Sequence, residues 1–271
     1  MVIQHNIAAI NSYRNLSTNQ SALSKNLEKL SSGYRINRAG DDAAGLAISE
    51  TMRSQINGLN QAVNNANDAI GLIQTAEGAL TETHSMLQRM KTLTTQASNS
   101  TYDKVARGNI QSELDALNAE ITRIASTTDF SGNKPLNAAG NLTFFIGASA
   151  DKANAVTLTM ADMKAAALKV DKLTVGNTTL AFKSMASVDL AISTVSTYRA
   201  QLGAAQNRLE HTVNNLKVTS ENITSAESRI RDTDMADEIT AYTKNNILLQ
   251  AAQSMLSQSN AMPQGVLSML Q

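Results

Sequence analysis

The residues of this chain that could carry out catalysis or bind a metal are few and lie far apart in the sequence. The three histidines, His5, His84 and His211, form no HExxH pair, and the chain has no cysteine. His84 and His211 could approach each other across antiparallel helices, but two imidazoles without a cysteine or a placed carboxylate make a poor metal site. No GxGxxG, GxxxxGK[ST] or GxSxG motif occurs. We therefore expect no catalytic, cofactor or metal site.

Asp41 and Asp42 are adjacent carboxylates, which in principle could act together as an acid and a base. They directly precede a long helical pattern, where an aspartate accepts hydrogen bonds from free backbone N–H groups and interacts favourably with the helix dipole. The sequence therefore predicts that this pair caps a helix.

The composition points away from nucleic-acid and membrane partners. Among the 271 residues, 23 basic and 23 acidic side chains cancel, so no net field attracts nucleic acid or an anionic membrane. No apolar run approaches the 18–20 residues of a membrane span, so we expect no membrane insertion. The first residues lack the basic and continuously apolar regions of a Sec signal peptide. Aromatic residues make up only 3% of the chain, which suits closely packed helices better than a thick globular core.

Apolar residues recur at helical spacing along most of the chain. The first pattern runs from Ile3 to Leu30, and the second from Ala44 to Ala97. We predict helices over 42–98, 102–127 and 184–231, besides one at each end of the chain. The second helix would be on the order of 80 Å long, since each residue adds about 1.5 Å. Helices of this length indicate a rod, which needs a partner for its apolar stripe.

The middle of the chain has a different character, and we predict a small β-rich cap over about 138–183. Leu142–Gly147 and Val156–Thr159 are short β-prone runs. Leu173–Val175 and Thr178–Phe182, separated by a Gly-Asn turn, read as a hairpin. The segment MADMKAAALKV between these runs fits either a helical turn or an extended connection. Near the other end, we expect 260–263 to interrupt the last helix.

These elements predict a mainly α fold of long antiparallel helical rods, similar to a coiled-coil bundle, with the β-rich hairpin as a cap. The expected domains are an N-terminal helix over 1–40, a rod domain over 41–231 and a C-terminal helix over 232–271. Both termini are helical and paired in this arrangement. Each terminal helix has too narrow an apolar stripe to be stable alone in water, so we expect it to order by packing against neighbouring subunits. The residues expected to mediate this assembly are Ile3, Ile7, Ile10, Leu27, Ile247, Met255, Leu256, Val266, Leu267 and Leu270.

Several long segments also resemble bacterial flagellins. They are Leu30–Ser49 (LSSGYRINRAGDDAAGLAIS), Asn64–Leu80, Asn207–Glu238 and the tail MPQGVLSMLQ, and the similarity covers about 1–135 and 184–271. The resemblance implies a short form without large outer domains, whose copies polymerise into the extracellular filament used for motility. It also implies export through the flagellar type III pathway. The implied partners are an export chaperone that holds the C-terminal helices, and the filament cap and hook-associated proteins. No enzymatic activity or cofactor is implied.

The resemblance further implies recognition by Toll-like receptor 5. The residues matching the family's receptor-contact pattern are Gln88, Arg89, Leu93 and Glu113. Thr92 departs from the pattern, because recognised flagellins commonly carry glutamate there. An alternative is that Leu87, Met90 and Leu93 only pack within the rod and that Arg89 is merely solvated.

Three other functions compete with the filament subunit. A hook–filament junction protein shares the terminal architecture, but would not carry such full flagellin signatures at both ends. An amphipathic-helix module that binds membranes would show a basic polar face, which this sequence lacks. An enzyme is the weakest alternative, because the middle of the chain is too short for the inserted protease domain that some large flagellins carry.

Overall fold

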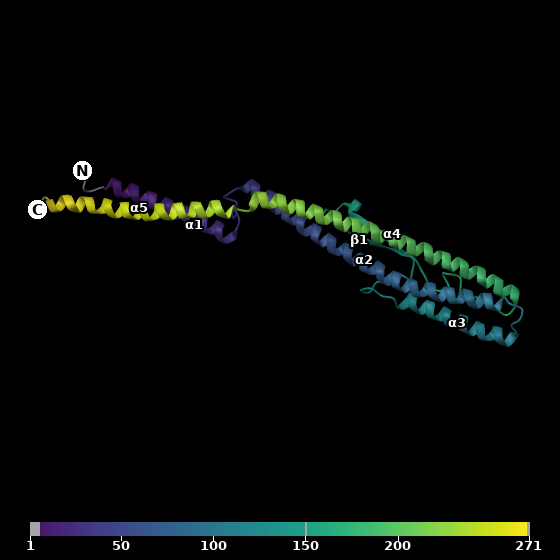
Figure 1. Cartoon of the computed structure of the whole chain (residues 1–271). Helices are drawn as coiled ribbons and strands as arrows, with labels where there is room; N and C mark the ends of the chain where they lie inside the picture. Colours follow the sequence, from purple (N-terminus) through teal and green to yellow (C-terminus); the bar gives the residue numbers. More distant parts are fainter. Residues whose placement is uncertain (1–5, 150, 270–271) are drawn as a thin grey trace. The chain divides into compact units, whose positions relative to one another are not determined.

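The computed structural model describes residues 6–149 and 151–269, and most of them are helical (Figure 1). Two strands and a short 3-10 helix, η1 (Lys152–Asn154), interrupt the succession of helices. The mainly α fold is confirmed. The five helices described are α1 (Ile7–Ser32), α2 (Ala43–Ala97), α3 (Lys104–Thr127), α4 (Thr178–Arg231) and α5 (Met235–Met269).

The chain divides into two compact units, with the boundary inside α2 and α4. The central unit comprises Gln55–Ser220. The terminal unit comprises the described residues up to Ser54 and those from Glu221 onward.

In the central unit, α2 and α4 run antiparallel, as the sequence predicts (Figure 1). Residue numbers rise along α2 while those of its contacts fall along α4. These contacts are Asn60–Ser220 (3.4 Å), Glu77–Arg199 (3.3 Å) and Lys91–Asp189 (2.7 Å).

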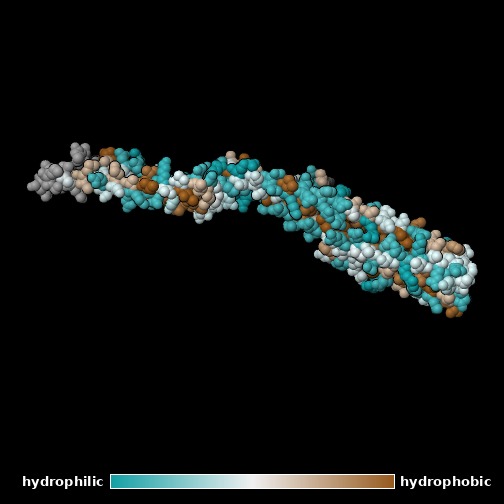
Figure 2. All heavy atoms as spheres, in the orientation of Figure 1, coloured by the Kyte–Doolittle hydropathy of each residue, from teal (hydrophilic) through white to brown (hydrophobic). Residues whose placement is uncertain are grey.

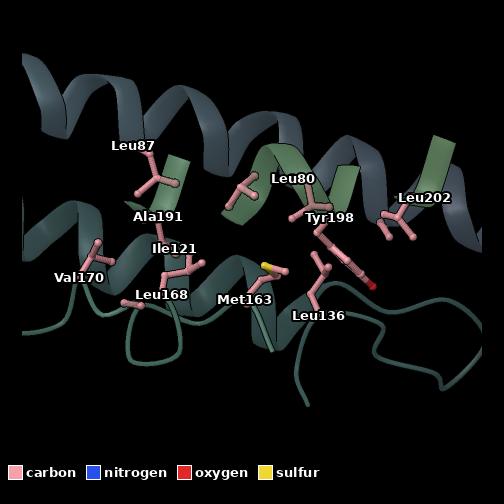
Figure 3. Close-up of a cluster of buried hydrophobic side chains, with 14 of the residues drawn as sticks. Leu80, Leu87, Ile121, Leu136, Met163, Leu168, Val170, Ala191, Tyr198 and Leu202 are labelled. Atoms are coloured by element: carbon pink, nitrogen blue, oxygen red, sulfur yellow. The ribbon is translucent and has the colours of Figure 1, made fainter. Parts of the chain in front are cut away.

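The core of the central unit lies between α2, α3, α4 and the segment that follows β2 (Figure 3). Alanines of α2 are buried beside larger side chains, so the helices can approach closely. Removing each leucine or isoleucine from water contributes about 1.5–3 kcal/mol. The fully buried large residues include Leu80, Leu87, Leu114, Ile121, Leu136, Val170 and Leu202.

The β-rich cap is only partly as predicted. Strands β1 (Gly140–Phe145) and β2 (Ala155–Met160) pair antiparallel, with Leu142 opposite Leu158. The segment MADMKAAALKV, which sequence alone left open, forms turns after the end of β2.

The predicted hairpin over 173–182 is wrong, because Thr178 already begins α4. The Asn177 side chain accepts a hydrogen bond from the Leu180 N–H (2.8 Å), which caps this helix. The Gln111 side chain accepts from the Val175 N–H (3.0 Å), and the Ser184 hydroxyl bonds both backbone groups of Thr174. Side chains thus satisfy the backbone groups of 174–175 that a partner strand would otherwise have bound. As a result, α4 begins at Thr178, six residues earlier than predicted.

In the terminal unit, α1 and α5 lie side by side in antiparallel directions (Figure 1). Asn6 contacts Ser259 near one end of the pair, and Lys29 lies 3.8 Å from Glu238 near the other. Gly33 ends α1 with φ +75°, a left-handed conformation that suits glycine, as the sequence predicts.

The expected interruption of the last helix at 260–263 is also wrong, since α5 continues through Pro263 to Met269. Proline lacks the N–H that would bond the carbonyl four residues earlier, which belongs to Ser259. The Asn6 side chain instead donates its Nδ2–H to that carbonyl (2.8 Å). A residue from the opposite end of the chain thus replaces the missing helical hydrogen bond.

Candidate assembly surface

The paired terminal helices have no apolar core of their own. In the part of α1 and α5 whose side chains are described, the only buried residues are Asn26 and Ser259, and both are polar. Helices gain most of their stability by burying an apolar face, so this pair lacks the packing that stabilises the central unit.

Large apolar side chains of both helices are instead exposed to solvent. Figure 2 shows hydrophobic residues (brown) on the surface of the part of the molecule that contains α1 and α5. Each such side chain would contribute about 1.5–3 kcal/mol if another surface removed it from water. The exposed residues of this kind are Ile7, Ile10, Tyr13 and Leu27 in α1, and Met235, Ile239, Ile247, Leu248, Met255 and Met262 in α5.

The structure places five of the ten predicted assembly residues on this surface. Ile7, Ile10, Leu27, Ile247 and Met255 are exposed, with Ile7 at 61% and Met255 at 64%. Of the other five predicted residues, Leu256 is half-buried. Val266 and Leu267 lie in α5, but the structure does not describe their side chains. Ile3 and Leu270 lie outside the described residues.

The predicted set omits five exposed residues, namely Tyr13, Met235, Ile239, Leu248 and Met262. Tyr13 is three residues after Ile10, and Met262 is seven after Met255. Those spacings would have placed both on the faces of their predicted neighbours. We refer below to the exposed apolar residues of α1 and α5 as the terminal apolar surface.

Backbone and side-chain contacts at the base of the terminal unit join the chain before α2 to the chain after α4. Tyr34 and Asp232 form an antiparallel bridge. Arg231 is nearly buried, places its guanidinium 4.7 Å from the centre of the Tyr34 ring, and binds Glu50 Oε1 through Nη1 (2.7 Å). The hydrogen bond from Arg231 holds the pKa of Glu50 below its usual value.

Asp42 caps α2, as predicted, whereas Asp41 binds backbone groups of the loop that precedes it. Asp42 Oδ1 accepts from the Gly45 N–H (2.9 Å) at the start of α2. Asp41 Oδ2 accepts from two backbone N–H groups in the preceding loop, those of Arg38 and Asn37. These bonds lower the pKa of Asp41.

The residues predicted to contact a receptor lie on α2 and α3. Arg89 and Glu113 form an exposed ion pair (2.8 Å), and Gln88 Nε2 is 2.9 Å from His84 Nε2. Leu93 is only 2% exposed and belongs to the core of the central unit. Its side chain could touch a receptor only after repacking, so three of the four residues are available on the surface.

None of the helices, within the residues described, is sufficiently long and apolar to cross a membrane.

Comparison with known proteins gives matches over nearly the whole chain. Residues 3–140 match the bacterial flagellin N-terminal helical region, and 185–270 match the bacterial flagellin C-terminal helical region. The chain is 51% identical to a flagellin of Bacillus subtilis and 48% identical to one of Halalkalibacterium halodurans, with all of both chains covered in each case. Among solved structures, a putative flagellar hook-associated protein from Vibrio parahaemolyticus has a similar fold (TM-score 0.59). It is 11% identical, and the match covers 71% of this chain and 100% of that one.

Proposed function

The chain belongs to the bacterial flagellin family, and we propose that its copies join through the terminal apolar surface. As a member of this family it is a structural subunit of the extracellular flagellar filament and not an enzyme. The observation that carries the proposal is that α1 and α5 pair without burying an apolar side chain among those described. Several copies packed together would supply the core that one copy lacks.

The exposed isoleucines Ile10 and Ile247 test this assignment. We expect the Ile10→Asp, Ile247→Asp variant to remain monomeric under conditions in which the unchanged chain forms filaments, because burying an unpaired carboxylate opposes packing. The measurement is electron microscopy after seeding. Gln253→Asp, an exposed polar position on α5, is the control and should still polymerise. Normal filaments from the double variant would refute the assignment.

We propose that the predicted domain limits 1–40, 41–231 and 232–271 also separate the segments that carry assembly from the segment that forms the rod. In this proposal the two terminal segments carry assembly, and the residues between them form a rod that folds independently. The buried core of the central unit supports this proposal.

The subunit further requires a route out of the cell, and we propose the flagellar type III export pathway. The apolar residues that α5 exposes support the proposal that a cytoplasmic export chaperone covers this helix before export. The filament cap and hook-associated proteins would then meet the subunit at the ends of the filament. Secretion of the protein by a strain whose flagellar export gate is deleted would contradict the export route.

We propose that Toll-like receptor 5 recognises the exposed surface around Gln88, Arg89 and Glu113, with Leu93 holding α2 in place from the core. The Arg89–Glu113 ion pair supports this, because it presents both charges on one face of the central unit. We expect Arg89→Ala to lower receptor signalling by monomeric protein about tenfold, equivalent to about 1.4 kcal/mol of binding.

Arg123→Ala is a matched control for the receptor test. Arg123 is similarly exposed and pairs with Glu120, but lies elsewhere on α3. Equal signalling by the Arg89→Ala variant and the unchanged chain in a cell reporter assay would rule out this contact.

A further inference from the structure

The exposed methionines of the described chain are concentrated on one helix. The chain has 11 methionines and no cysteine, so methionine is the only residue that carries sulfur. Met235, Met255 and Met262 are 45%, 64% and 50% exposed, and all three lie on α5. The other methionines whose side chains are described are buried or half-buried, and Met90 and Met163 are at most 3% exposed. A reagent in solution that attacks sulfur therefore meets α5 before the core of the central unit.

These exposed methionines belong to the terminal apolar surface. Leu248, Met255 and Met262 follow one another at intervals of seven residues and are all exposed, so they lie on one side of α5. Met255 also lines an open hollow of about 350 Å³ between α1 and α5, to which α1 contributes Ser12 and Asn15. The sulfur atoms thus lie on the surface that we propose to pack against other copies.

The thioether of methionine reacts with peroxides. Hydrogen peroxide transfers one oxygen atom to the sulfur and leaves as water, so the sulfur loses two electrons and the peroxide gains them. The product, methionine sulfoxide, is polar, whereas the thioether is apolar. No other bond of the chain forms or breaks in this step.

Oxidation at these positions would oppose the packing of copies. In a free subunit the sulfoxide oxygen is exposed to water and remains hydrated. Between packed copies the same oxygen would lie among apolar side chains, and a polar group buried without a hydrogen-bond partner destabilises the contact. The core of the central unit is unaffected, because Met90 and Met163 are buried in it.

We propose that Met235, Met255 and Met262 form an oxidation site, at which a peroxide converts the terminal apolar surface into a form that does not polymerise. The inference rests on the proposed function, because it requires this surface to be covered by other copies in the filament. Free subunits are then sensitive to peroxide, whereas subunits within a filament are protected. Methionine sulfoxide reductases make the change reversible.

Mass spectrometry of the full chain tests the reactivity of the site. Monomers and filaments are treated with the same concentration of hydrogen peroxide for a series of times, and the sulfoxide at each methionine is quantified after digestion. In monomers we expect Met235, Met255 and Met262 to oxidise about tenfold faster than Met90 and Met163, because a buried sulfur is shielded. In filaments the three should be slowed to the rate of the buried pair. Equal rates for the exposed and buried methionines in monomers would overturn the inference, as would equal rates for α5 in monomers and in filaments.

Seeded growth of the oxidised monomers tests the consequence for assembly. We expect the critical concentration to rise about tenfold when the three sulfoxides are present. Treatment with the reductases for both sulfoxide epimers should return it to the original value. An unchanged critical concentration would overturn the inference, and so would a failure to recover after the sulfoxides have been reduced.

The Met235→Leu, Met255→Leu, Met262→Leu variant is the matched control. Leucine keeps the apolar character and nearly the volume of methionine but has no sulfur to oxidise. This variant should polymerise equally well before and after peroxide treatment, although its other methionines remain. Loss of growth after treatment would assign the sensitivity to other residues and overturn the inference. Failure of the untreated, unchanged chain to polymerise would instead count against the proposed function.

Discussion

At the scale of single residues, Asn6 makes one hydrogen bond that caps its own helix and a second that reaches the helix at the other end of the chain. Its Oδ1 accepts from the Ala9 N–H (3.1 Å) and caps α1, while its Nδ2 donates to the Ser259 carbonyl (2.8 Å). That carbonyl lacks a helical donor because Pro263 stands four residues later. One side chain therefore satisfies a free group on each of the two paired helices.

This arrangement predicts an energetic coupling between Asn6 and Pro263. We expect Asn6→Ala to lower the hydrogen-exchange protection of α5 amides in filaments about tenfold, because a cap is lost and a carbonyl is left without a donor. In a Pro263→Ala background the same change should cost less, since the substituted alanine supplies the missing N–H. Equal losses of protection in both backgrounds would show that the two residues are not coupled.

At the scale of elements, Arg231 joins the end of α4 to the start of α2 within the terminal unit. Its guanidinium contacts both Glu50 and the Tyr34 ring, and its carbonyl accepts from the Arg35 N–H (2.7 Å). Because the folded pKa of Glu50 is lowered, this pair stabilises the folded state above the unfolded pKa of a glutamate, about 4.3. The contribution is lost as the pH falls through the lower, folded pKa.

Acid should therefore loosen the terminal unit partly through Glu50. We expect Glu50→Gln to reduce the thermal stability of the chain at pH 7 and to have progressively less effect as the pH falls through the lowered pKa of Glu50, because the carboxylate then becomes protonated. The measurement is the melting temperature by circular dichroism across this range. Glu120→Gln is a control, because Glu120 also has a lowered pKa but pairs within α3. A pH-independent effect of Glu50→Gln would contradict this explanation.

At the scale of the whole molecule, the two units differ in how their apolar residues are used. The central unit buries leucines such as Leu80, Leu87 and Leu202 in its own core. The terminal helices, by contrast, expose residues such as Ile10 and Ile247. The central unit therefore has what it needs to fold as a monomer, while the terminal helices depend on neighbouring copies.

A fragment comprising residues 41–231 tests this difference. We expect it to be helical, to unfold cooperatively, and to remain monomeric under conditions in which the full chain polymerises, because it lacks α1 and α5. Circular dichroism and electron microscopy of seeded samples measure the two properties. Long filaments from the fragment would mean that the central unit alone carries assembly.

The sequence by itself determined the helices, their antiparallel pairing, the β1–β2 strands and half of the exposed apolar positions in α1 and α5. These features follow from local periodicity and caps, such as Gly33 after α1 and Asp42 before α2. Only the tertiary structure showed that 173–182 does not form a hairpin, that α5 continues through Pro263 and that Leu93 is buried. Each depends on a partner distant in sequence: Gln111 binds Val175, and Asn6 binds the carbonyl that Pro263 leaves free. Periodicity reports which face of a helix is apolar, but not which distant group will satisfy a backbone atom or cover a side chain.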